Sequence, residues 1–131
     1  MDRRFELALG NFESALSRLE EVLVFDETDV VRDSIIKRFE FTFEMAWKAC
    51  FRWLRARGVD INEEAFAVLP RAFQNRLVND EGLWRDIRKA RNLTAHTYQE
   101  KTAIEVAAIA RSVALPAFKD LLATLKARAE E

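Results

Sequence analysis

Residues 29–57 read DVVRDSIIKRFEFTFEMAWKACFRWLRAR and carry two neighbouring apolar stripes. One stripe is Ile35, Phe39, Thr42, Ala46, Ala49 and Trp53, and the other is Ile36, Phe43, Trp47, Cys50 and Leu54. Because residues three and four apart share one side of an α-helix, the stretch predicts a long helix that stops at Gly58. Its apolar surface is wider than one partner helix would cover. This predicts a central helix, a subunit interface, or both.

The residues before this stretch predict a first helix over residues 2–24. Its stripe alternates spacings of four and three, and consists of Phe5, Leu9, Phe12, Leu16, Leu19 and Leu23. Residues 25–28 read as a turn. Thr28 or Asp29 is expected to cap the following helix, since a short side-chain oxygen can accept an unpaired backbone N–H there.

Three further helices are predicted after Gly58. Asn62 is expected to cap the third, and Pro70 to bend or split it because proline lacks a backbone donor. The fourth is expected over residues 81–98, and the fifth over 101–128 with a kink at Pro116. The inner stripe of the fourth is Leu83, Ile87, Ala90 and Thr94. Residues expected to face inward on the fifth are Ile104, Ala108, Leu115, Phe118, Leu122 and Leu125.

The composition agrees with a helical fold. The chain has 131 residues with three Gly and two Pro, too few turn residues for a many-stranded sheet. We therefore expect one domain over residues 1–131, an all-α, antiparallel up-and-down four-helix bundle with an additional shorter helix. No apolar run approaches the roughly 18 residues of a membrane span, and the single cysteine excludes an intramolecular disulfide. These features predict a cytoplasmic protein without membrane association.

The charges are unevenly distributed although the net charge is only −1. Residues 34–59 carry six Lys/Arg against two Glu, a balance of +4, and residues 85–91 carry four Lys/Arg against one Asp, a balance of +3. Either a local basic face or ordinary solvated helix faces would produce this pattern.

The end of the fourth helix concentrates chemically capable side chains: Arg88, Arg91, Asn92, His96 and Tyr98. Arginine binds phosphate through two parallel hydrogen bonds, and histidine exchanges a proton near neutral pH. A phosphodiester attacked by its own 2′-hydroxyl needs a base, an acid and positive charge, without metal or cofactor. A lone histidine at a helix end is also commonly a capping or core residue.

Arg91 and His96 would not meet easily on one straight helix, where they differ by about 140°. They converge only if the long arginine side chain wraps, if the helix ends between them, or if a second subunit completes the site.

Three parts of the sequence resemble one known family. Residues 32–48 (RDSIIKRFEFTFEMAWK), the pair Leu83-Trp84, and residues 91–98 (RNLTAHTY) are similar to the nucleotidyltransferase substrate-binding proteins of the HEPN superfamily. The resemblance implies a helical bundle like the C-terminal domain of kanamycin nucleotidyltransferase. It also implies homodimers, with higher assembly an open possibility, and a minimal nucleotidyltransferase encoded nearby.

The family resemblance also implies roles for individual residues. In one view the pair is a toxin–antitoxin system, in which an Arg-x4-His motif makes the bundle a metal-independent endoribonuclease. Arg91 would then bind the scissile phosphate, Asn92 would position it or the histidine, and His96 would be the acid/base. Tyr98 would accept AMP from the nucleotidyltransferase, which silences the toxin. In the other view the chain is a non-catalytic subunit that helps a nucleotidyltransferase hold its substrate.

A symmetric dimer would answer the geometric difficulty. Two copies of the fourth helix near one axis would let Arg91 of one subunit face His96 of the other, with Arg88 widening the basic cleft. In either view the bound substrate is an RNA or a nucleotide.

Overall fold

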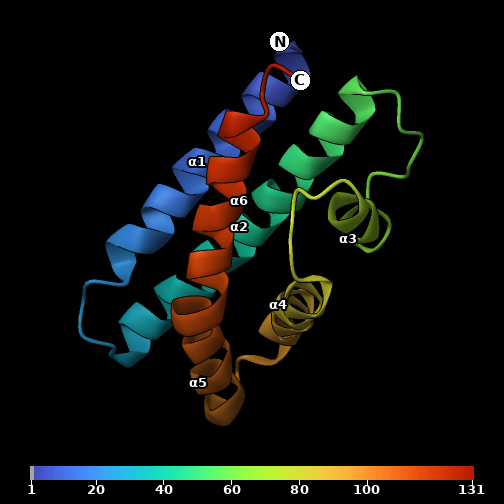
Figure 1. Ribbon diagram of the computed structural model, residues 1–131. Coiled ribbons are helices and arrows are strands. Elements are labelled where there is room, and N and C mark those ends of the chain that lie inside the picture. Colours follow the sequence, from blue (N-terminus) through green and yellow to red (C-terminus); the bar gives the residue numbers. More distant parts are fainter. Residues whose placement is uncertain (1) are drawn as a thin grey trace.

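The computed structural model describes residues 2–131 and shows an all-α bundle (Figure 1). The helices are α1 (Arg3–Val22), α2 (Asp29–Ala56), α3 (Ala65–Gln74), α4 (Glu81–Leu93) and a long C-terminal helix. That last helix consists of α5 (Glu100–Ile109), a π-helical turn η2 (Ala110–Ala114) and α6 (Leu115–Ala127). Residues 2–131 contain no β-strand, and no helix among them is long and apolar enough to cross a membrane. The predicted all-α fold is confirmed.

Helix α2 is the central element of the bundle. It packs against α1, α3, α4, α5 and α6. All eleven residues of its two predicted stripes are buried. The width of this apolar surface is therefore used within one chain, so it gives no reason to expect a subunit interface on α2.

The capping side chains fix where α1 and α2 begin. Asp2 Oδ1 accepts a hydrogen bond from the Phe5 N–H at 2.9 Å. Thr28 Oγ1 accepts one from the Val31 N–H at 3.2 Å, which confirms the threonine as the cap of α2. Gly58 follows with a φ of 81°, a left-handed conformation that glycine adopts without strain.

Helix α3 differs from its prediction at both named residues. Glu64 rather than Asn62 precedes the helix, and its side chain makes no capping hydrogen bond. Pro70 lies inside α3, which continues through it as one helix. Proline removes only the hydrogen bond to the carbonyl four residues earlier, that of Phe66 in the exposed first turn. The loss of that bond is tolerated there because water can replace it.

The predicted irregularity in the C-terminal helix lies one turn before Pro116. The Leu115 N–H donates to the Ala110 carbonyl, five residues back, so the helix is wider there than an α-helix. Residues four apart therefore lie on the same side of the helix through this turn. The buried side carries Val106, Ala110, Ala114 and Phe118. Ile104 and Ala108 were predicted to face inward but are exposed. The predicted stripe kept one constant helical period along the whole helix, and this period does not account for the extra width of the π-turn.

Aromatic packing ties α4 to the core. Phe118 on α6 contacts three rings, with centroid distances of 6.2 Å to Phe12, 6.2 Å to Phe39 and 5.7 Å to Trp84. Trp84 itself is buried. This contact holds α4 against the bundle.

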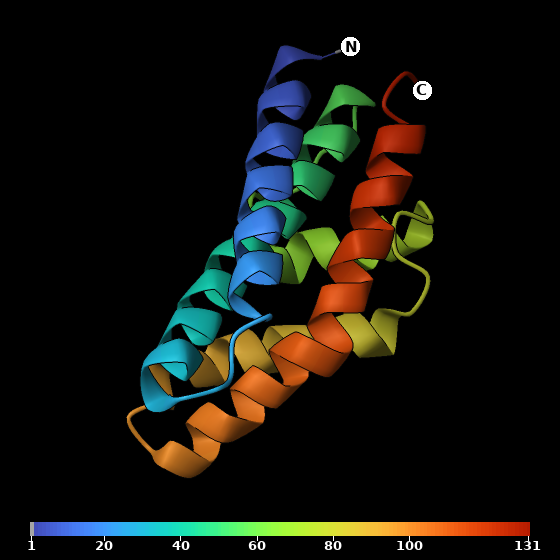
Figure 2. The ribbon, with the colours of Figure 1, turned by 90° about the vertical axis from the view of Figure 1, so that its left-hand side faces the viewer.

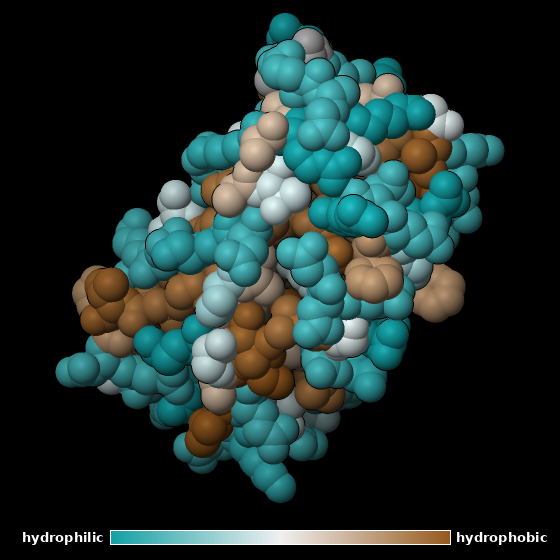
Figure 3. Space-filling view, in the orientation of Figure 1, coloured by the Kyte–Doolittle hydropathy of each residue, from teal (hydrophilic) through white to brown (hydrophobic). Residues whose placement is uncertain are grey.

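Helices α3 and α4 lie across the long helices. Both are seen nearly end-on in Figure 1, at the side of α2 away from α1, whereas Figure 2 shows α4 lengthwise. The surface in Figure 3 is mostly hydrophilic, and hydrophobic surface gathers at lower left where α1 joins α2. Val24, Phe25 and Val30 are exposed in that turn. The candidate site lies at the opposite side of α2, on α4.

Candidate functional site

The predicted site residues straddle the end of α4. The α-helix ends at Leu93, and Thr94–His96 form a 3₁₀ turn, so the helix predicted to reach residue 98 is shorter. Thr94 Oγ1 donates to the Arg91 carbonyl at 2.7 Å, and Thr97 Oγ1 donates to the Thr94 carbonyl at 3.1 Å. Hydroxyls that bond to carbonyls of the preceding turn compete with continued helix, which explains the early end. Of the three possibilities for Arg91 and His96, the helix does end between them.

Arg91 is held in one orientation by two neighbours. Its Nε donates to Glu44 Oε1 on α2 at 3.2 Å, and its Nη1 donates to Thr94 Oγ1 at 2.9 Å. The second oxygen of Glu44 accepts from Trp47 Nε1 at 3.0 Å. The Arg91 and Glu44 side chains are about a third exposed (31% and 32%), so one edge of the guanidinium still faces solvent.

Three predicted residues meet at one hollow. Arg88, Arg91 and Asn92 line a depression of about 440 Å³ between α2, α3 and α4. Glu63, Glu64 and the exposed ring of Phe66 contribute to its far wall. The hollow therefore combines two cations, an amide and an aromatic ring with carboxylates.

His96 and Tyr98 are not part of that hollow. Both are exposed, Tyr98 by 79%, and their rings meet edge to face with centroids 6.1 Å apart. Within residues 2–131 the structure records no hydrogen bond between His96 and Arg91. One chain thus brings Arg88, Arg91 and Asn92 together and presents His96 beside Tyr98 separately.

The sequence did not reveal the contacts that fix Arg91, which involve Glu44, Thr94 and, through Glu44, Trp47. Glu44 and Trp47 are three apart on α2, a spacing that permits their hydrogen bond, but nothing in the sequence indicates that Glu44 faces α4. Thr94 was predicted as an inner residue of the fourth helix, and it is buried. Its hydroxyl, however, bonds to Arg91 instead of only filling core space.

The basic segments differ in how their charges are paired. Arg52 lies 3.8 Å from Glu63 and Arg55 lies 3.4 Å from Asp60, so much of the charge on residues 34–59 is compensated locally. In the other segment Arg85 lies 3.8 Å from Glu81, whereas Arg88 has no carboxylate partner within residues 2–131. An available positive charge therefore remains on α4 near the hollow.

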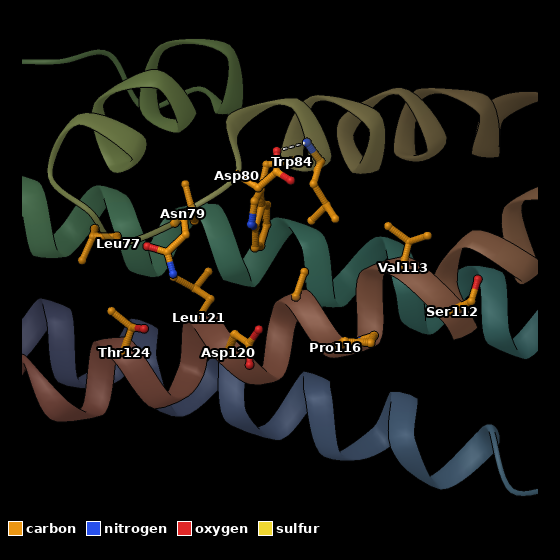
Figure 4. Close-up of a pocket in the computed structure, with 13 residues that line it drawn as sticks. Leu77, Asn79, Asp80, Trp84, Ser112, Val113, Pro116, Asp120, Leu121 and Thr124 are labelled. Atoms are coloured by element: carbon orange, nitrogen blue, oxygen red, sulfur yellow. Dashed lines mark hydrogen bonds between the residues drawn. The ribbon is translucent and has the colours of Figure 1, made fainter.

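A second hollow, of about 290 Å³, contains none of the predicted site residues. Figure 4 shows Asn79 and Trp84 on one side of it and Asp120 and Thr124 of α6 on the other. Asp80 caps α4 there by accepting from the Leu83 N–H at 3.0 Å. This hollow lies on the opposite side of Trp84 from the exposed face of α4, and its Asp80 has a structural role.

Comparisons with known proteins give concordant results. The family model of nucleotidyltransferase substrate binding protein like proteins matches residues 7–127. A probable ribonuclease HepT from Haemophilus influenzae is 30% identical over 117 residues, 77% of this chain and 80% of that protein.

Solved structures share the fold over nearly their full length. HI0074 from Haemophilus influenzae, described as the fold of a substrate binding domain of a nucleotidyltransferase, has a TM-score of 0.80 and 28% identity, covering 90% of this chain and 98% of that one. The protein ttk003001694 from Thermus thermophilus has a TM-score of 0.75 and 31% identity, covering 92% and 99%.

A third structure shares the fold at lower identity. It is a tri-AMPylated Shewanella oneidensis HEPN toxin in complex with MNT antitoxin, with a TM-score of 0.76 and 18% identity, covering 97% of this chain and 99% of that one. The match over residues 7–127 and the 30% identical relative show that the chain belongs to the family of nucleotidyltransferase substrate binding protein like proteins.

Proposed function

We propose that this protein is a cytoplasmic, metal-independent endoribonuclease toxin whose partner nucleotidyltransferase silences it. The observation that carries the proposal is Arg91, fixed through Nε and one Nη with its remaining edge open to solvent. A guanidinium held in this way is prepared to bind a phosphate without first being ordered. The likeness to a probable ribonuclease HepT supports the same activity.

The proposed chemistry uses the 2′-hydroxyl of the RNA as nucleophile. His96, exposed in the turn after α4, takes the proton from this hydroxyl. The 2′-oxygen then bonds to phosphorus as the bond to the 5′-oxygen breaks, and the protonated His96 gives its proton to the departing 5′-oxygen. The products are a 2′,3′-cyclic phosphate and a 5′-hydroxyl. Arg91 stabilises the charge on the phosphoryl oxygens, and Asn92, which lines the same hollow, positions the phosphate or the histidine.

A homodimer completes the site in this proposal. Arg91 lies at the hollow and His96 does not, so a second copy that brings its own His96 to the hollow would supply the acid/base. His96 is exposed, as are the nearby apolar side chains of Leu93 and Ile104, which supports an interface at this end of the bundle. Arg88 would widen the resulting basic cleft.

Tyr98 is the proposed off-switch. Its side chain is 79% exposed, so its hydroxyl is accessible to a modifying enzyme, and its ring touches His96 at its edge. An AMP group attached there would place a bulky anion beside the acid/base and repel RNA phosphates. The tri-AMPylated HEPN toxin bound to MNT antitoxin supports a nucleotidyltransferase as partner.

A second function has its own support. Glu44 already satisfies part of Arg91, and Glu63 and Glu64 add negative charge to the hollow, which opposes binding of a polyanion. A non-catalytic subunit that holds a small substrate for a nucleotidyltransferase would suit this hollow. HI0074, described as such a substrate binding domain, supports this interpretation.

Purified protein, incubated with single-stranded RNA and a chelator, tests the first function. We expect cleavage by the wild type and none by His96→Ala, because His96 is the only histidine in the chain. Gln99→Ala is the matched control, since Gln99 is exposed three residues further on. Both variants should keep the wild-type circular dichroism spectrum. Equal cleavage by His96→Ala and wild type would end the proposal.

Expression of the chain alone separates the two functions. An endoribonuclease toxin should arrest growth, and His96→Ala should relieve the arrest. A substrate-binding subunit should be harmless in both forms.

A further inference from the structure

An exposed aromatic ring lies between the Arg91 hollow and a second groove. Phe66, on the first turn of α3, is 72% exposed although phenylalanine strongly favours burial. Its ring borders the Arg91 hollow on one side. On the other side it borders a groove of about 380 Å³ between α3 and α4, the helices that lie together beside α2 in Figure 1. The ring thus connects the two depressions.

Three arginines and the carboxylate of Glu81 line the groove beside this ring. The guanidinium carbon of Arg88 lies 5.4 Å from the Phe66 ring centroid, and Arg71 and Arg85 line the groove beyond it. Neither Arg71 nor Arg88 has a carboxylate partner within residues 2–131. Their Nε atoms are also buried there without a hydrogen-bond acceptor. Buried donors are rarely left unpaired, so these two guanidinium groups are incompletely satisfied in the free chain.

We infer that the α3–α4 groove is a subsite for single-stranded RNA, in which one unpaired base stacks on Phe66 and the adjoining phosphates bind Arg88 and Arg71. This inference rests on the proposed ribonuclease function and extends it to substrate choice. A base stacked on Phe66 places the neighbouring phosphate towards the hollow that contains Arg91. The enzyme therefore requires an unpaired nucleotide beside the scissile bond, because a paired base cannot reach the ring.

The chemistry of the groove favours this occupant over a protein segment. Proteins bind single strands by combining aromatic rings, which accept any base face, with cations along the backbone. The same ring and the same Arg88 line both the groove and the hollow, so a single chain of phosphates can contact both. A protein segment bound in the groove would not explain why the groove lies next to the hollow that contains Arg91.

Binding of a short fluorescein-labelled RNA tests the subsite. Fluorescence anisotropy is measured with oligoadenylate in the His96→Ala background, which prevents cleavage. We expect Phe66→Ala to weaken binding about tenfold, the usual loss when one base-stacking ring is removed. Phe66→Trp should restore binding, whereas a duplex of the same length should compete poorly. Arg88→Gln should lower the slope of log Kd against log salt by about 0.7, as expected for one phosphate contact to a single strand.

Phe41→Ala is the matched control. Phe41 is 53% exposed on α2, and Lys37 lies 5.1 Å from its ring centroid, so it also pairs an exposed ring with a cation. It does not line either depression around Phe66. Its replacement should leave the affinity for RNA unchanged.

The outcomes separate this subsite from the proposed function. RNA cleavage by the wild type with an unchanged KM in Phe66→Ala would overturn the subsite and leave the ribonuclease intact. Equal binding by Phe66→Ala and Phe41→Ala would also overturn it. A change in oligomeric state or partner binding in Phe66→Ala, with unaltered RNA affinity, would assign the groove to a protein instead. If the wild type neither binds nor cleaves RNA, both proposals fail.

Discussion

The Nε atom of Arg91 on α4 lies 3.2 Å from Oε1 of Glu44 on α2, while the other oxygen of Glu44 accepts from Trp47 Nε1 at 3.0 Å. Both oxygens of the carboxylate thus face donors. A carboxylate satisfies this arrangement because it only accepts, whereas an amide would turn its NH₂ towards one of the two donors. Glu44 therefore positions Arg91 from outside the Arg-x4-His motif.

Replacing Glu44 tests this positioning role. Glu44→Gln should reduce the free energy of unfolding by about 1 kcal/mol, since one donor loses its acceptor and the pair is partly exposed. RNA cleavage should fall through kcat more than through KM, because Arg91 keeps its charge but loses its fixed orientation. Urea unfolding and steady-state kinetics measure the two effects.

The matched control is Glu40→Gln on the same helix. Glu40 lies 3.7 Å from Lys37, whose side chain is 62% exposed, so losing this pair should change stability by less than about 0.5 kcal/mol. Cleavage should be unaffected. If both variants behave alike, Glu44 has no special role towards Arg91.

The core around Phe118 gives a prediction on stability. Phe118 is fully buried and contacts Phe12, Phe39 and Trp84. Phe118→Ala should cost about 3–5 kcal/mol, because it removes a ring and leaves a cavity. Equilibrium urea unfolding measures the loss, and Phe41→Ala at the surface should shift the midpoint only slightly. A small loss in Phe118→Ala would mean that the neighbouring rings collapse into the space.

The sequence predicted the central helix more completely than it predicted the site. A regular period over residues 29–57 identifies buried positions, because burial on α2 depends only on which way each side chain points. The wide surface was open to two explanations, and the structure supports the central helix. Residues 104 and 108 were misplaced because the π-turn at Ala110–Ala114 changes the period, and nothing before Pro116 signals where the extra width falls.

The candidate site depends on relations that no local pattern contains. The motif between Arg91 and Tyr98 was visible as a group of residue types. Its partner Glu44 is 47 residues away in sequence, and their contact depends on how α4 crosses α2. The α-helix likewise ends at Leu93 because the hydroxyls of Thr94 and Thr97 donate hydrogen bonds to backbone carbonyls of the preceding turn. These hydrogen bonds compete with those of a continued helix.

Burial of Cys50 predicts a pH dependence of stability. Burial raises the pKa of the Cys50 thiol to about 12 from its usual value of 9.0. The folded state therefore holds this proton more tightly than the unfolded state, so the thiol contributes its full stability below about pH 9 and loses it as pH rises towards 12. The free energy of unfolding should fall by up to about 1.4 kcal/mol per pH unit in this window.

Comparison with Cys50→Ala isolates this contribution, since lysines and the tyrosine titrate in the same range. The variant should be less stable at about pH 7 but should lose less stability between about pH 9 and 11 than the wild type. Identical slopes in the two proteins would show that the thiol does not set the dependence.

Tyr98 gives the most direct test of the proposed silencing. Its exposed hydroxyl is the expected acceptor of AMP, and its ring contacts His96 at its edge. Co-expression with the nucleotidyltransferase proposed as its partner should add the mass of AMP to the wild type and abolish growth arrest. Tyr98→Phe removes the hydroxyl but keeps the ring, so it should carry no AMP and should continue to arrest growth beside the same partner. Intact-protein mass spectrometry and colony counts measure these effects. An unmodified wild-type chain that the partner still neutralises would show that silencing occurs by binding alone, with Tyr98 outside the mechanism.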